Sequence, residues 1–359
     1  MSRAIAPVGT STDTIIITGA GGVGKTTLSA AIGAATARTG RRTLVLTIDP
    51  AKRLADALGI DELGDEPTPV AGTPNMHAAM LDVSASWEAI IHRYADPDVG
   101  DRLLVNPYFR AIADRFPAAQ AYAAGERMAE YIESRAFDLI VVDTPPSGGG
   151  IDFFRAPATT GDLVSGKLLK WLTGSHIPGR SFLYRFTAKP MLRIADSVLG
   201  GPMLSDVADF LLDLRTMYDA LSARSRTIER YLRGATTVIA TTADPTPLRE
   251  AHRFFRELSG FRIEPAALVF NRALPEAWIA DADAPLRGIA DAELRATVKA
   301  NLRAWAAEAR RQADARDELS SRYGLPVHTV AWQSPPPESI ADLIAMIDAA
   351  DLDGIIGID

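Results

Sequence analysis

The run Gly-Ala-Gly-Gly-Val-Gly-Lys-Thr-Thr at residues 19–27 constrains the fold of this chain more than any other feature. It follows an apolar run at residues 14–18 and precedes a helical pattern at residues 28–38. The spacing from the first glycine to Gly-Lys-Thr is that of a phosphate-binding loop, and strand, loop and helix is the order that this motif requires. A glycine-rich turn between a strand and a helix is the plainer alternative, which the complete pattern disfavours.

The residue types of this loop match the chemistry of a bound nucleotide. Glycines let the backbone turn so that successive amides face phosphate oxygens, while the following helix adds the positive end of its dipole. Lys25 supplies a positive charge for the β- and γ-phosphates, and the Thr26 hydroxyl is a ligand for Mg²⁺. The expected ligand is therefore ATP or ADP with Mg²⁺. The loop residues expected to contact the nucleotide are Gly21, Gly22, Val23, Gly24, Lys25, Thr26 and Thr27.

Several short, nearly continuous apolar runs indicate strands that are buried on both faces of a parallel sheet. They lie at residues 14–18, 43–48, 138–142, 236–240, 266–270 and 326–330, with 77–81 as a weaker candidate. Because helical patterns separate these runs, we predict an α/β fold, the doubly wound, mostly parallel sheet of a P-loop NTPase. The loop motif occurs once and no long repeat is visible, which indicates a single ATPase unit.

Two stretches, residues 87–133 and 151–233, carry helical patterns without an intervening strand. The second predicts a helical subdomain inserted at the ligand-binding edge of the sheet. Its apolar residues form either the core of that subdomain or, in part, a groove for an apolar client. The expected division is a flexible N-terminus at 1–12, a first part of the P-loop core at 13–150 that includes the helical segments at about 87–133, a helical insert at 151–233, and a second part of the core at 234–359. Further helices are expected near 246–258, 291–321 and 338–349.

The composition of the chain excludes several kinds of binding partner and several cellular locations. A net charge of −7 argues against a nucleic-acid surface, because such surfaces need clustered positive charge. The 359 residues include no cysteine, which excludes disulfides, iron–sulfur clusters and thiolate metal sites. No apolar stretch approaches the roughly 20 residues of a membrane span, and the N-terminus lacks the pattern of a signal peptide. We therefore expect a cytoplasmic protein with no nucleic-acid partner and no transmembrane segment.

Three polar residues end predicted strands, where open α/β sheets bind their ligands. Asp49 precedes Pro50 and either caps the following helix or orients the water that attacks the γ-phosphate. Asp143 ends a buried strand, which is the arrangement of a Walker B acid that holds Mg²⁺ directly or through its water. Residues 144–150 form a proline- and glycine-rich loop that can change conformation with the γ-phosphate. Asn271 either reads the adenine edge or terminates a strand.

Together these motifs resemble those of the arsenical pump-driving ATPase family. That family includes the guided-entry ATPase for tail-anchored proteins, and it belongs to the deviant Walker A group with the nitrogenase iron protein and the partitioning ATPases. The resemblance rests on Gly-Gly-Val-Gly-Lys-Thr-Thr, the Asp-Pro-Ala after the second strand, the Val-Val-Asp-Thr-x-Pro-x-Gly run and the late strand that ends in Asn. It covers most of the chain outside the helical insert.

The resemblance implies an ATP hydrolase with specific residue roles. Asp49 matches the switch I aspartate that positions the attacking water, and residues 143–148 match switch II. Asn271 matches the residue that reads adenine, and residues 332–336 lie where the family closes over the base. The family members are typically dimers that open and close with the nucleotide state and move their helical subdomains together.

This chain also departs from the family pattern. The signature lysine that reaches the partner subunit's nucleotide is Ala20 here, and the switch II histidine is replaced by Gly149. Without cysteine, neither the family's arsenite-binding thiols nor the zinc-bridging cysteine pair can exist. The charge that is missing at Ala20 is supplied either by a paralogous partner chain or in cis by a residue such as Lys52 or Arg53.

We therefore expect a Mg²⁺-dependent ATPase that couples ATP binding and hydrolysis to movement of a helical subdomain, which binds a client or partner such as a membrane protein. The expected assembly is a homodimer or a heterodimer with a related ATPase. Lys25 and Asp49 are the expected catalytic residues, and Thr26 and Asp143 are the expected metal ligands. One alternative is an ATP-binding regulatory subunit of a heteromeric ATPase with weak hydrolysis of its own. Another is a P-loop kinase that phosphorylates a small molecule.

Overall fold

The computed structural model describes residues 12–49, 51–146, 148–165, 203–281, 286–350 and 352–356. The chain divides into two compact units. The core unit comprises Met1–Met80, Tyr131–Ile151 and Gly234–Asp359, and the helical unit comprises Leu81–Glu130 and Asp152–Arg233. The sequence division placed the helical segments at 87–133 with the core, whereas the structure groups most of them with the insert.

The core unit contains an eight-stranded sheet in the order β3-β4-β2-β5-β1-β6-β7-β8. Its strands are β1 (Asp13–Gly19), β2 (Thr43–Thr47), β3 (Thr68–Pro69), β4 (Met76–Met80), β5 (Leu139–Asp143), β6 (Thr236–Thr241), β7 (Ala267–Ala273) and β8 (Val327–Ala331). Neighbouring strands are parallel except for the antiparallel pair β3 and β4. The doubly wound, mostly parallel sheet and all seven predicted strands are thus confirmed, and only the two-residue β3 lacked a prediction.

The central strands are apolar throughout because helices cover both faces of the sheet. In β1, Ile15 and Ile17 belong to the cluster that packs under α1 (Lys25–Arg38). Ile16 points to the opposite face of the pleat and is also fully buried. On that face α12 (Pro245–Gly260) contacts β1 and β6. Two-sided burial therefore accounts for the continuous apolar runs in the sequence.

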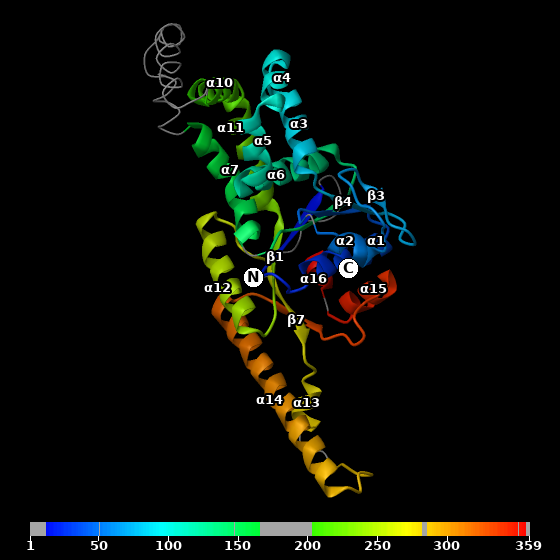
Figure 1. Ribbon diagram of the computed structural model, residues 1–359. Helices are drawn as coiled ribbons and strands as arrows, with labels where there is room; N and C mark the ends of the chain where they lie inside the picture. The colour runs from blue at the N-terminus through cyan, green and yellow to red at the C-terminus, as the bar shows by residue number, and fades with distance from the viewer. Residues whose placement is uncertain are drawn as a thin grey trace. The chain divides into compact units, whose positions relative to one another are not determined.

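The helices of the core unit are α1, α2 (Arg53–Leu58), α12, α13 (Ala277–Asp281), α14 (Ala292–Tyr323), α15 (Ile340–Asp348) and α16 (Asp353–Ile356). The three helices expected near 246–258, 291–321 and 338–349 are confirmed as α12, α14 and α15. Local signals fix the ends of α14: the Asp291 side chain accepts a hydrogen bond from the amide of Leu294, and Gly324 ends the helix with φ of 62°. In Figure 1, α14 extends well beyond the sheet with α13 beside it.

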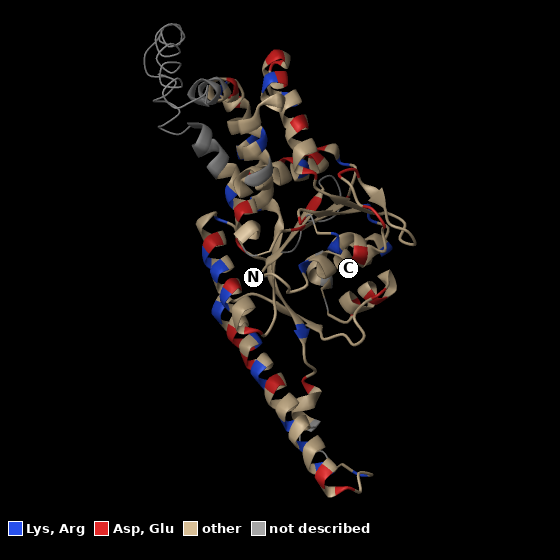
Figure 2. Ribbon diagram, viewed as in Figure 1, with Lys and Arg blue, Asp and Glu red and all other residues tan. Residues whose placement is uncertain are grey.

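Charged residues of both signs occur along α12 and α14 (Figure 2). They form ion pairs within one helix, as between Arg311 and Glu308, and with neighbouring segments, as between Arg316 and Glu276 in the turn before α13. In the part of the chain that the structure describes, no helix is both long enough and apolar enough to cross a membrane.

The helical unit is built from α3 (Val83–Tyr94), α4 (Pro97–Val105), α5 (Pro107–Arg115), α6 (Pro117–Ser134), α7 (Gly148–Ser165), α10 (Met203–Thr216) and α11 (Tyr218–Gly234). Prolines stand at the first position of α4 and α5, where their missing N–H costs no hydrogen bond. Four apolar residues of the insert, Phe153, Phe154, Phe210 and Met217, are buried in this unit. The described residues do not include the apolar residues Leu168, Leu169, Trp171, Leu172, Phe182, Tyr184, Phe186 and Leu199 of the same insert.

A buried charge network joins three helices of this unit. Glu126 on α6 is only 2% exposed and accepts hydrogen bonds from Arg93 on α3 and Arg224 on α11 at 3.1 and 2.6 Å. The Tyr94 hydroxyl donates to the same carboxylate at 3.2 Å. A carboxylate buried in this way is tolerated only because several donors compensate its lost hydration. The network therefore fixes the register of α3, α6 and α11.

Candidate nucleotide site

The strand order brings the predicted site residues to one edge of the core sheet. β5 lies between β1 and β2, and Asp143 at the end of β5 is in register with Ile17 of β1 and Thr47 of β2. The loop after β1 and the residues after β2 therefore meet at the carboxyl end of β5. This is the edge where open α/β sheets bind their ligands.

The phosphate loop forms the turn from β1 into α1. Gly22 and Gly24 have φ of 76° and 89°, in the left-handed region that side chains with a Cβ rarely adopt. Gly21 and Gly22 are exposed, whereas the Val23 side chain is buried in the core. Helix α1 begins at Lys25 and has no acidic residue in its first turn, so nothing on the helix opposes an anion at its positive end.

Lys25 lies folded back over the loop. Its ammonium donates hydrogen bonds to the carbonyls of Gly19 and Ala20 at 3.1 and 2.9 Å, and the residue is only 7% exposed. Burial lowers the pKa of Lys25, and the nearby Asp143 and Asp49 carboxylates partly offset this. The side chain is thus a positive charge held against the loop backbone, with neither carboxylate hydrogen bonded to it.

Asp143 is fully buried and receives two hydrogen bonds on one oxygen. The hydroxyls of Thr26 and Thr47 donate to Oδ2 at 2.8 and 3.0 Å, while Oδ1 accepts no hydrogen bond from the described residues. Burial raises the pKa of this carboxyl to about 6, against the opposing effect of the two hydroxyls and Lys25. An orphaned carboxylate oxygen beside a threonine hydroxyl is a hard-oxygen donor set that fits Mg²⁺. The described ranges contain no group of three or more His, Cys, Asp or Glu side chains that could hold a metal ion by themselves.

Asp49 follows β2 and faces the start of α2. Its Oδ1 accepts a hydrogen bond from the amide of Ala51 at 3.1 Å, and its Oδ2 pairs with the Arg53 guanidinium at 3.1 Å. The amide of Asp49 donates to the Thr47 hydroxyl at 3.2 Å, which connects this turn to Asp143. The residue at the helix-capping position of α2 is Lys52, so Asp49 stabilises the turn before α2 and does not cap the helix.

Asn271 is buried near the end of β7. Its Nδ2 donates to the carbonyl of Val23 at 2.7 Å, and its Oδ1 accepts from the amide of Arg272 at 2.9 Å. In this arrangement the amide contacts the phosphate loop. The loop at 332–336 follows β8, and Trp332 is 47% exposed.

Gly149 lies in the first turn of α7, close to the segment that follows β5. A Cβ at this position would lie 2.8 Å from the Cβ of Pro145, a separation that real side chains do not tolerate. The backbone therefore has no room for histidine at Gly149 in this conformation. The neighbouring Thr144 hydroxyl donates to the carbonyl of Ile17 at 2.8 Å and ties this segment to β1.

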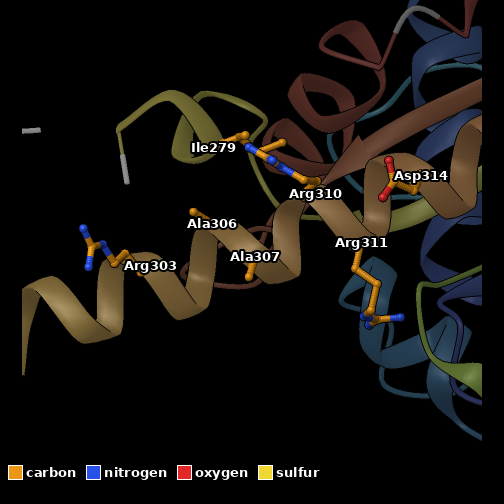
Figure 3. A pocket seen from close by; sticks show the side chains of 7 residues that line it. All are labelled: Ile279, Arg303, Ala306, Ala307, Arg310, Arg311 and Asp314. Carbon is orange, nitrogen blue, oxygen red and sulfur yellow. The ribbon is translucent and has the colours of Figure 1, made fainter. Parts of the chain in front are cut away.

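A separate shallow pocket of about 380 Å³ lies between α13 and α14 (Figure 3). It is lined by Ile279, Arg303, Ala306, Ala307, Arg310, Arg311 and Asp314. Arg310 extends toward Ile279 in Figure 3, and Arg311 is engaged by Glu308 and by the carbonyl of Ala243. The pocket contains none of the motif residues, so the phosphate loop remains the candidate site.

The fold and the loop geometry define the chain as a P-loop nucleoside triphosphatase. The model of the anion-transporting ATPase family matches residues 12–285, and the chain therefore belongs to that family. This confirms the resemblance inferred from the motifs, and the protein is accordingly an ATP hydrolase.

Curated relatives support the same assignment. An ATPase GET3 from Mycosarcoma maydis is 27% identical over 262 residues, which cover 72% of this chain and 72% of that protein. An ATPase GET3 from Rhodotorula glutinis is 27% identical over 261 residues, or 72% of this chain and 70% of that protein. An ATPase get3 from Aspergillus terreus is 25% identical over 264 residues.

Two contacts of the site were not anticipated from the sequence. Thr47 is a second donor to Asp143, and Arg53 is an ion-pair partner of Asp49. The four-residue spacing of Asp49 and Arg53 is a local signal that can reveal the second contact. The contact between Thr47 and Asp143 depends on which strand lies next to β5, and no local sequence pattern gives the order of the strands.

Proposed function

We propose that this protein is a Mg²⁺-dependent ATPase in which the nucleotide state of the phosphate loop moves the helical unit, which binds a client or partner. The observation that supports the site most directly is Asp143 Oδ1, a buried carboxylate oxygen that accepts no hydrogen bond from the described part of the chain and lies near the Thr26 hydroxyl and the Lys25 ammonium. A buried group of this kind is costly unless a ligand completes it.

Each residue of the site has a separate role in the proposed function. The loop amides and Lys25 bind the β- and γ-phosphates, and Thr26 and Asp143 hold the metal ion. Mg²⁺, when bound, supplies positive charge to the phosphate oxygens. Asp49 orients the attacking water, and its carboxylate is already placed by Ala51 and Arg53.

The link to the helical unit is covalent. Helix α7 begins at Gly148, five residues after Asp143. It continues through Ile151, where the core segment Tyr131–Ile151 ends, into the apolar residues Phe153 and Phe154. A change at the switch II segment is therefore transmitted along one helix into the other unit. The family resemblance supports a dimer and an apolar client, such as a membrane protein, for that unit.

Release of phosphate from ATP without any added acceptor tests this function. We expect measurable, Mg²⁺-dependent release that is slow, on the order of one turnover per minute or less, against about 10 per second for a median enzyme. The reason is Ala20, because a missing charge at the γ-phosphate costs about 10³-fold by analogy with arginine fingers. Release only with a small-molecule acceptor would support the kinase alternative, and nearly absent release would support the regulatory subunit.

Two neighbouring substitutions separate the sources of the missing charge. Arg53 pairs with Asp49, and its charge also contributes to the lowered pKa of Lys25, so it lies near the loop. If Arg53 acts in cis, Arg53→Ala lowers the turnover further while Lys52→Ala leaves it unchanged. If a paralogous partner supplies the charge, both variants keep the slow rate. Rapid turnover by the isolated chain would contradict the heteromer.

A further inference from the structure

The end of β7 is irregular where Asn271 and Arg272 occur. The pairing of β7 with β8 shifts register between Phe270 and Ala273, so these two residues form a bulge. Arg272 has φ of 58°, in the left-handed region that non-glycine residues rarely adopt. Bulges re-aim side chains at functional sites, and here the bulge leaves Asn271 buried and Arg272 exposed.

Both polar ends of the Asn271 amide are engaged. Oδ1 accepts from the backbone of Arg272 at 2.9 Å, which fixes the orientation of the amide plane. Nδ2 then donates to the carbonyl of Val23 at 2.7 Å, at a separation of 248 residues along the chain. The bond is buried, where a hydrogen bond is strong and a missing partner is costly.

The absence of a side chain at Gly24 leaves room for this contact. A Cβ built on Gly24 would lie 2.3 Å from Nδ2 of Asn271. Gly24 also has φ of 89°, so the close approach and the backbone conformation both require glycine here. The loop backbone and the Asn271 amide therefore pack directly on each other.

The contact controls a peptide group of the phosphate loop. The carbonyl of Val23 and the N–H of Gly24 belong to one planar trans peptide and point in opposite directions. When Asn271 holds the carbonyl, it also sets the direction of the Gly24 N–H. That N–H is one of the loop amides that the proposed function places around the phosphates, and it immediately precedes Lys25.

We propose that Asn271 is a positioning residue that holds the phosphate loop in its binding conformation, so that it sets the affinity for the triphosphate group of any nucleotide. This differs from reading the adenine edge, which the family resemblance implies for Asn271. The inference rests on the proposed function in one respect, namely that the loop binds phosphates.

Calorimetric binding of three ligands tests the proposal: ATP, GTP and inorganic tripolyphosphate, each with Mg²⁺. Asn271→Asp keeps the acceptor for the Arg272 amide but turns a carboxylate oxygen toward the Val23 carbonyl. Asn271→Ala removes the donor without that repulsion. We expect all three affinities to fall by a similar factor, about tenfold in Asn271→Ala and more in Asn271→Asp. Weaker ATP binding with unchanged tripolyphosphate binding in both variants would overturn the proposal.

Hydrogen exchange and a control variant complete the test. In the folded variants, amides of residues 19–27 should exchange faster, while those of the preceding strand at 14–18 stay as in the wild type. Unchanged exchange in the loop would contradict the proposal. If one of the two Asn271 variants has a lowered thermal unfolding midpoint, ligand affinity and hydrogen exchange are compared with the wild type in the other variant. Lys25→Ala must lose tripolyphosphate binding; if it does not, the phosphate-loop assignment itself fails, independently of Asn271.

Discussion

Replacement of Lys25 by alanine is expected to remove most of the affinity for ATP, by a factor on the order of 10² or more. The ammonium is the positive charge that lies against the loop, bonded to the carbonyls of Gly19 and Ala20. Charge-assisted contacts to phosphate are about twice as strong as neutral hydrogen bonds, and burial strengthens them. Without Lys25, the loop amides would face the β- and γ-phosphates with no counter-charge from the loop.

Calorimetry with ATP and Mg²⁺ measures this effect. Lys299→Ala is the matched control, because Lys299 is an exposed lysine on α14, outside every segment of the candidate site. We expect the control to bind ATP like the wild type in this assay. Wild-type affinity in Lys25→Ala would rule out this loop as the nucleotide site.

Asp49→Asn is expected to leave ATP binding nearly intact and to slow hydrolysis by a factor on the order of 10² or more. Asparagine keeps an oxygen that can accept the hydrogen bond from Ala51, so the turn before α2 is preserved. It removes the negative charge that orients the attacking water and that pairs with Arg53. The loss therefore falls on the rate constant and not on affinity.

Single-turnover hydrolysis, with ATP affinity measured in parallel, separates these two effects. Asp56→Asn is the control, because it makes the same chemical change on an exposed position of α2. If Asp49→Asn turns over at the wild-type rate, then Asp49 serves only to stabilise the turn.

Local patterns predicted most of the fold. Two-sided burial makes the strands near-continuous apolar runs, and the helix expected near 291–321 agrees with α14 within two residues at each end. The phosphate loop combines strand, glycines and helix start in one local segment, so its place in the fold followed directly. The family assignment rested on the order of several such segments, and the family match over residues 12–285 confirms it.

What the sequence lacked is information about non-local neighbours. The order of β5 between β1 and β2 decides that Thr47 and Thr26 share one oxygen of Asp143. The bulge at the end of β7 decides that the amide of Asn271 contacts Val23. The helical patterns of residues 81–130 would be the same if these helices packed on the sheet or with the insert. Only the structure shows that they group with the insert.

Hydrogen exchange of the helical unit in two nucleotide states tests the central claim most directly. The full chain is compared with ADP and with a non-hydrolysable ATP analogue, both with Mg²⁺, over residues 153–218. The account predicts different protection in this range, beginning near Phe153 and Phe154 on α7, with unchanged protection in the buried strand β6. Identical protection of residues 153–218 in the two states, at saturating nucleotide, would contradict coupling between the phosphate loop and the helical unit.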